Sequence, residues 1–333
     1  MITSKNKLTV LAASLLALAT TVSAADMSSV KISGFVAASY QYAKTSGVAG
    51  VDSVFSGATS VAGWGDAAKV IFSAGEGPVN GTVSLFYLPN RAGDEIGVLD
   101  AYLTYDLGSG WSVKGGKYLS PLGYEAFNIP DMIAITYGTS IYAVPAYHSG
   151  LELDYGDKEW SAGLGVVDSI YGGTGFFAGD NSLQGNKGIE GFVSYKGIEN
   201  TVLWAGFAHE GAGGPVAGQT KAFTVYDFWA SYQLNKETSL AAEWIYNTEI
   251  ATGAGSSSAW LAAVNYAFSN ELSTTFRVSG GDATFISATN TTKYTLAPAY
   301  KVNDHFTVRT ELSIINVAGP DTTFFGLQGV FKF

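Results

Sequence analysis

The sequence predicts an all-β fold, a transmembrane antiparallel up-and-down β-barrel of about 16 strands. The chain is 14% aromatic, contains 41 glycines and is only 14% charged, a composition typical of many short strands. After residue 24 no apolar run is long enough for a membrane helix, because hydrophobic residues occupy alternate positions. Short and long connections also alternate along the chain, as in outer-membrane barrels.

The N-terminus has the pattern of an export signal. Lys5 and Lys7 precede an apolar run over residues 8–20, and the run leads to Val22, Ser23 and Ala24, a small-x-small cleavage pattern. We therefore expect residues 1–24 to be a cleaved signal peptide and residues 25–333 to form the barrel. A retained membrane helix is the alternative, although the run is shorter than the ~20 apolar residues that a span needs.

Charge and cysteine content exclude several classes of function. Without residues 1–24 the 18 basic residues fall to 16, against 28 acidic ones, so nucleic acid is an unsuitable partner. The absence of cysteine excludes disulfides and thiolate metal sites. His148, His209 and His305 lack the spacing of metal or catalytic motifs, so we expect no metal, no cofactor and no enzymatic activity.

The strands follow in order from period-2 alternation bounded by turn residues. Most have about the 9 to 11 residues that a tilted strand needs to cross a bilayer. One face is apolar and the other polar, as where Leu103 and Tyr105 alternate with Thr104 and Asp106, and we expect the apolar face to contact outer-membrane lipid. The predicted strands cover residues 30–43, 66–74, 79–88, 96–107, 110–119, 147–155, 159–168, 188–196, 200–210, 222–234, 237–247, 257–269, 271–281, 291–302, 304–315 and 322–333.

The connections between these strands indicate which rim each end lies on. Short turns such as 108–110 and 197–199 alternate with long segments, a rhythm that favours a barrel with periplasmic turns over a soluble sandwich. Aromatic residues gather at strand ends, as at Tyr105 and Trp111, where a membrane interface holds them. Rings that fill a soluble core are the alternative. The long segments are 44–65, 89–95, 120–146, 169–187, 211–221, 248–256, 282–290 and 316–321.

The longest connection, residues 120–146 between strands 5 and 6, determines the predicted width of the interior. A barrel of about 16 strands leaves a water-filled lumen. The apolar stretch 127–135 should not lie free in water, so we expect the segment to fold inward and form a constriction. An ordinary surface loop or an oligomer contact is the alternative.

The charges predicted to face the lumen form two opposed arcs. Basic side chains lie on the last four strands and the first two, and acidic side chains on strands 4 to 11. We expect a transverse field at the constriction, between Glu125 and Asp131 of the long loop and Arg277 and Arg309 of the wall. Solvated charges without selective effect are the alternative. The other predicted lumen charges are Lys69, Asp100, Asp227, Glu243, Lys293 and Glu311.

Two segments resemble a known family. Residues 116–125 read GKYLSPLGYE and residues 145–150 read PAYHSG. They resemble the OmpL-like putative β-barrel porins of Gram-negative bacteria, over the mature chain. The resemblance implies passive diffusion of small hydrophilic solutes or ions, with a non-conducting structural or adhesive barrel as the alternative.

Two further features concern assembly. The segment 120–146 lacks the Pro-Glu-Phe-Gly-Gly motif of trimeric general porins, so a homo-oligomer is left open. The C-terminal Phe333 is typical of the signal that the barrel-assembly machinery reads in outer-membrane proteins.

Overall fold

The computed structural model describes most of the chain from residue 30 onward. The predicted signal peptide, residues 1–24, lies outside the described residues, as do parts of the predicted loops other than 120–146. The described residues are 30–54, 66–89, 95–171, 183, 187–213, 221–249, 255–282, 290–317, 319 and 321–333.

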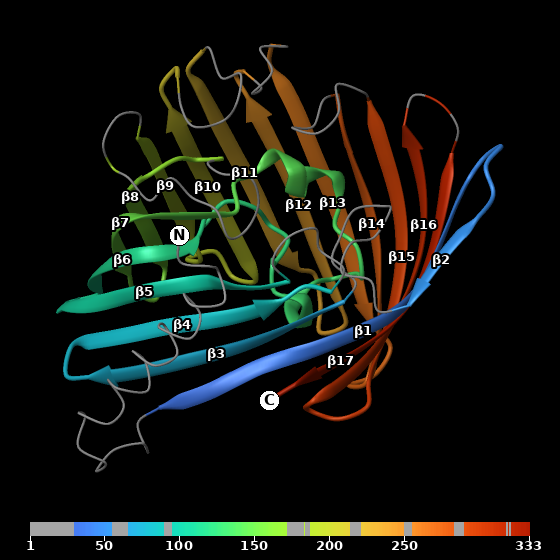
Figure 1. Ribbon diagram of the computed structural model, residues 1–333, viewed down its shortest axis with the longest axis horizontal. Coiled ribbons are helices and arrows are strands. Elements are labelled where there is room, and N and C mark those ends of the chain that lie inside the picture. Colours follow the sequence, from blue (N-terminus) through green and yellow to red (C-terminus); the bar gives the residue numbers. More distant parts are fainter. Residues whose placement is uncertain are drawn as a thin grey trace, which may run out of the picture.

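The strands of the described residues form one antiparallel sheet that closes on itself (Figure 1). Phe35 of β1 pairs with Lys332 of β17 on one side and with Lys69 of β3 on the other, and this double pairing joins the ends of the sheet. In this part of the chain sixteen strands, β1 and β3–β17, complete the ring, so the prediction of a 16-stranded barrel is confirmed. Their bounds are β1 (Lys31–Thr45), β3 (Ala67–Glu76), β4 (Val79–Tyr87), β5 (Ile96–Gly108), β6 (Trp111–Leu119), β7 (Tyr147–Gly156), β8 (Trp160–Val167), β9 (Gly188–Tyr195), β10 (Thr201–Glu210), β11 (Phe223–Gln233), β12 (Thr238–Asn247), β13 (Ser257–Ala267), β14 (Leu272–Gly281), β15 (Thr291–Lys301), β16 (Phe306–Val317) and β17 (Thr322–Lys332).

One short strand was not predicted. Strand β2 (Val51–Val54) lies within the predicted loop 44–65 and pairs with residues 40–43 of β1. Four residues are too few for a period of two to be distinguished from the surrounding loop. The strand lies beside the ring and extends the β1 ladder beyond the point where β3 stops pairing with it.

The two faces of the ring differ in polarity, as strand alternation requires. Leu103, Leu151 and Leu327 point outward, with 61%, 57% and 44% of their surfaces exposed. Arg277 and Gln328, on the inner face, are fully buried. An apolar exterior around a polar interior is the arrangement of a membrane barrel, whereas a soluble barrel packs its apolar side chains inside.

Aromatic pairs mark the ends of the strands. Trp111 and Tyr155 lie 4.9 Å apart across β6 and β7, and Trp160 and Tyr195 lie 4.4 Å apart across β8 and β9. These two pairs lie beside short turns at one rim, where indole and phenol groups favour a membrane interface. Among the described residues, no helix has both the length and the apolar character to cross a bilayer.

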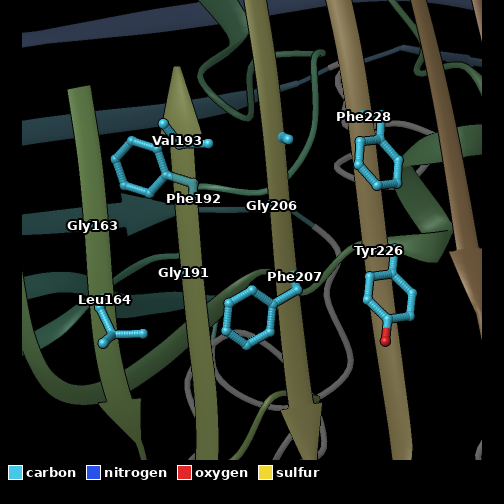
Figure 2. A pocket seen from close by; sticks show the side chains of 10 residues that line it. Gly163, Leu164, Gly191, Phe192, Val193, Gly206, Phe207, Tyr226 and Phe228 are labelled. Atoms are coloured by element: carbon cyan, nitrogen blue, oxygen red, sulfur yellow. The ribbon is translucent and has the colours of Figure 1, made fainter. Parts of the chain in front are cut away.

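The outer face is hollowed between β8 and β11. A groove of about 390 Å³ opens there, where the small residues Gly191 and Ala205 lie among larger side chains. Figure 2 shows Leu164, Phe207 and Phe228 around it. The groove belongs to the apolar outer surface, so it lies apart from the polar interior.

Candidate functional site

The segment 120–146 leaves the end of β6 and returns to the start of β7. Its two ends are held together by a hydrogen bond of 2.7 Å from the Ser120 amide to the Ala146 carbonyl. Between them lie two short 3₁₀ helices, η2 (Ile129–Asp131) and η3 (Thr139–Ala143). In Figure 1 this green segment lies inside the ring, where η3 contacts β12, β13 and β14.

The apolar stretch of the segment is covered by the barrel. Ile129 and Ile135 are 1% and 0% exposed, and Met132 and Val144 are also buried. Transfer of hydrophobic side chains out of water is favourable, so burial of this stretch stabilises the segment inside the ring. The fixed hydrogen bonds of the segment's polar groups then determine where along the wall it lies.

The first contacts join the segment to acidic side chains of β11 and β12. The Gly123 amide donates to Asp227 Oδ2 at 2.7 Å, and the Tyr124 amide donates to Glu243 Oε1 at 2.5 Å. A carboxyl group can accept a backbone N–H in either protonation state. These carboxylates therefore satisfy backbone donors that the irregular segment leaves without partners of its own.

The central contact is an ion pair between the segment and β14. Arg277 donates from one terminal nitrogen to Glu125 and from the other to Thr295 Oγ1 at 3.1 Å. The second carboxylate oxygen of Glu125 accepts the Gly138 amide at 2.5 Å. Glu125 is 6% exposed and Arg277 is fully buried, so this pair is secluded from water.

A second pair of opposite charges, on β15 and β16, binds residues 136 and 137. Lys293 Nζ donates to the Thr136 hydroxyl and, at 2.8 Å, to the Tyr137 carbonyl. Glu311 accepts the Thr136 amide at 2.7 Å, and its carboxylate lies 3.7 Å from Lys293. Both charges are buried and both contribute to holding the same turn of the segment.

Helix η2 is held by Arg309 of β16. Its two terminal nitrogens donate to the carbonyls of Ile129 at 2.7 Å and Pro130 at 2.5 Å. Asp131, at the end of the same helix, is exposed. The planar guanidinium suits this double contact, because its donors point in fixed directions toward two acceptors.

On the opposite part of the wall, Lys69 and Asp100 form an ion pair of 2.8 Å between β3 and β5. Lys69 Nζ also lies 3.4 Å from Asn128 Oδ1 of the segment. The six charged wall residues all lie on the inner face of their strands: Lys69, Asp100, Asp227, Glu243, Lys293 and Glu311. Most of these charges bind the segment or one another.

The four residues assigned to the constriction divide into two groups. The structure brings Glu125 into direct contact with Arg277 and places Arg309 against the carbonyls of η2, so these three are buried. Only Asp131 is exposed. Glu125 and Arg277, which were expected to face each other across water, thus lie in contact, and together with Arg309 they hold the segment against the wall.

The phenols of the segment are neutral groups. Burial, together with the nearby Glu125 carboxylate, raises the pKa of Tyr142 to about 12 and also raises the pKa of Tyr137. The Tyr137 hydroxyl donates to the Phe127 carbonyl at 3.2 Å. Both tyrosines therefore carry no charge near neutral pH, and Tyr137 acts within the segment as a hydrogen-bond donor.

One contact at the root of the segment was missed from the sequence. His148 Nε2 lies 2.6 Å from Glu190 Oε1, and Glu190 Oε2 accepts the Ser120 hydroxyl at 2.9 Å. His148 immediately follows the segment and faces inward, so its position in the strand was the available signal. No cluster of His, Cys, Asp and Glu suited to a metal ion occurs among the residues that the structure describes.

Solved structures with this fold include several outer-membrane channels. The anion-selective porin from Comamonas acidovorans is 13% identical, with 92% of this chain and 99% of that chain covered and a TM-score of 0.69. The outer-membrane channel DcaP of Acinetobacter baumannii is 13% identical, with 91% and 97% covered and a TM-score of 0.65. The trimer form of OmpT from Vibrio cholerae is 12% identical, with 92% and 100% covered and a TM-score of 0.55. At these identities the likeness shows the fold.

The comparison with protein families is more specific. A search of curated proteins finds no match. The model of the family described as putative beta-barrel porin-2, OmpL-like, matches residues 29–330, nearly the whole chain. Together with the closed ring and its apolar exterior, this match places the protein among the porin-like barrels of the outer membrane. The chain belongs to the OmpL-like putative beta-barrel porin-2 family.

Proposed function

We propose that this chain is a passive diffusion channel for small hydrophilic solutes or ions, and that residues 120–146 form its constriction. The observation that carries the proposal is the asymmetry of the lumen. Most bonds of the segment go to β11, β12 and β14–β16, and two more go to Lys69 of β3 and Glu190 of β9. On β6 and β7, Lys114 and Asp154 keep 20% and 25% of their side chains exposed. A path for solutes would run along this second side.

The geometry supports a constriction of fixed width. The contacts of the segment come from separate strands of a closed ladder, which restrains each strand by two neighbours. A polar solute that passes would exchange part of its hydration for contacts with charged groups such as Lys114 and Asp154, which lie 3.7 Å apart. An apolar solute forms no favourable contacts with these charged groups and is more stable in the lipid, so the pore would not favour its passage.

The proposal includes the route to the membrane. Residues 1–24 would direct export and be cleaved, and Phe333 would be read by the barrel-assembly machinery. In support of the second point, the Phe333 amide and carbonyl both pair with Gly34, so the terminal residue forms part of the seam. A homo-oligomer belongs to the same proposal, since a structure of the same fold is described in a trimer form.

Planar-bilayer recordings test the channel directly. Purified, folded protein added to one side of a lipid bilayer should produce unitary current steps whose size rises with salt concentration. Heat-unfolded protein is the control, because it retains the sequence without the ring. Insertion of the folded barrel without any steps would contradict the proposal and favour a non-conducting structural or adhesive barrel.

A further inference from the structure

Aromatic side chains form a continuous strip on the inner wall. It consists of Phe192 on β9, Trp204 on β10, Trp229 on β11 and Tyr124 of the constricting segment. The Phe192 and Trp204 rings lie 6.0 Å apart with planes 10° from parallel, and the Trp204 and Trp229 rings lie 5.8 Å apart at 9°. Tyr124 meets Trp229 edge-on at 5.5 Å. We call these four residues the aromatic strip.

Glycines of the wall allow the rings to lie against the backbone. A Cβ added at Gly163 would stand 2.5 Å from the Phe192 ring, and one added at Gly206 would stand 2.3 Å from the Trp204 ring. Phe192 also borders the outer groove, and Figure 2 shows its ring between β8 and β9. The Phe192 and Trp204 rings therefore lie along the wall over these glycines, in or against a buried cluster that includes Leu122 of the segment.

Charged groups lie at one end of the strip. The same Cβ position at Gly163 is 2.8 Å from Asp154 Oδ1, so this carboxylate adjoins the Phe192 ring. Lys114 lies 3.7 Å from Asp154 and 2.6 Å from Glu152. Lys114 and Asp154 are the partly exposed members of this group, so a donor and an acceptor are available beside the rings.

The other end of the strip reaches the constriction. Tyr124 belongs to the segment itself, and its amide is fixed to Glu243 of β12. Phe192, Trp229 and Tyr124 are partly exposed, whereas Trp204 between them is 7% exposed. A solute in contact with the strip would therefore lie beside the narrowest part of the proposed pore.

We infer that the aromatic strip is a binding surface for saccharides, and this inference rests on the proposed channel function. A pyranose has a flat face of C–H groups and a rim of hydroxyls. The flat face suits the rings of Phe192 and Trp229, and the hydroxyls suit Asp154 as acceptor and Lys114 as donor. Sites for small ligands commonly combine apolar walls with a few placed polar groups in this manner.

A channel recording with maltohexaose tests the inference. Added to a conducting wild-type channel, this saccharide should interrupt the current in a concentration-dependent way. We expect Trp229→Ala to raise the half-blocking concentration about fivefold to tenfold, and Trp229→Phe to restore most of the block. The matched control is Phe228→Ala, which removes a ring from the outer face of the same strand and should leave the block unchanged.

Several outcomes would overturn the inference. Equal block of wild type and Trp229→Ala would show that the strip only packs against the segment. Equal block by poly(ethylene glycol) of the same mass would show an effect of size alone, and stronger block by indole would assign the strip to aromatic solutes.

The experiments distinguish a failure of the channel proposal from a failure of the saccharide-binding inference. Current steps without saccharide block would reject the inference and keep the channel. If no steps occur, tryptophan fluorescence titrated with maltohexaose in detergent decides the inference by itself. A saturable change that is lost in Trp229→Ala would support it, and no change would reject it.

Discussion

Charged residues inside the barrel hold irregular backbone in place. Arg309 donates to two consecutive carbonyls, and Glu311 accepts the Thr136 amide, so each side chain satisfies polar groups that a loop cannot pair internally. A buried charge is tolerated only when it is paired and hydrogen-bonded. The segment and the wall charges therefore depend on each other, and loss of one partner leaves the other buried and unpaired.

The clearest residue to test is Arg277. We expect Arg277→Ala to release part of the segment, because Glu125 would otherwise remain buried without its cation. The measurement is single-channel current in planar bilayers, where the variant should show larger steps and more open-state noise than wild type. Lys301→Ala is the control, since this lysine lies at a turn with half of its side chain exposed. Steps of unchanged size and noise in Arg277→Ala would argue against the anchor.

Sequence alone predicts that these residues face inward but not what they contact. Arg277 and Glu125 are 152 positions apart, and Arg309 binds a carbonyl 180 positions away. Alternation assigns a side chain to one face of its strand and carries no information about a loop that arrives from another part of the ring. For this reason charges that were expected to face open water are found in contact with the segment.

At the scale of the elements, strands are predicted well where one face is apolar and the other polar. Predicted and observed bounds differ by only a few residues, since the turn residues between strands are short and distinct. Strand β11 alternates regularly, with Phe228 outward and Trp229 inward, but both of these neighbours are aromatic. Adjacent aromatic residues conceal the period, so the aromatic strip was not recognised from the sequence.

The outward face of a strand can be tested by placing a charge on it. Leu327 lies near the middle of β17 and is 44% exposed on the apolar side. We expect Leu327→Arg to lower the free energy of unfolding by ~2 to 4 kcal/mol, as for a charge at the bilayer midplane. The measurement is guanidinium unfolding of the barrel in lipid vesicles, followed by tryptophan fluorescence.

The matched control for this substitution is an outward-facing leucine nearer to the membrane surface. Leu107 is also exposed, but it lies at the end of β5, next to a turn. Leu107→Arg should cost only ~0 to 1 kcal/mol, because the cost of a charge falls near the interfaces. Equal losses for both variants would contradict the assignment of β17 to the lipid.

At the scale of the whole molecule, closure of the ring creates the interior. The seam joins β1 near the N-terminus to β17 at the C-terminus, and Phe333 completes it by pairing with Gly34. The number of strands indicates a lumen wide enough for water, which is why a wet interior can be predicted from the sequence. The inward folding of residues 120–146 can be predicted as well, but the wall residues that hold the segment become apparent only in the structure.

The central claim is that residues 120–146 lie against strands β11–β16 while a path for solutes remains open beside β6 and β7. A Cβ at Gly138 would stand 3.2 Å from the Cβ of Ser279, near the ~3.5 to 4.5 Å of a disulfide, and Gly138 has an ordinary φ of −67°. The same Cβ would stand 2.8 Å from Glu125 Oε2 and 2.9 Å from Leu261 Cδ1, so the ends of these two side chains must shift in the variant. Because the native chain contains no cysteine, Gly138→Cys combined with Ser279→Cys introduces a unique pair. Each single variant serves as the control for folding and for unspecific oxidation.

The decisive measurement is the single-channel current of this double variant, oxidised and then reduced. The account predicts that the disulfide forms in the folded barrel and that current steps persist at nearly the same size before and after reduction. A pair that does not cross-link in the folded barrel, or a cross-linked channel that stays closed until it is reduced, would contradict it.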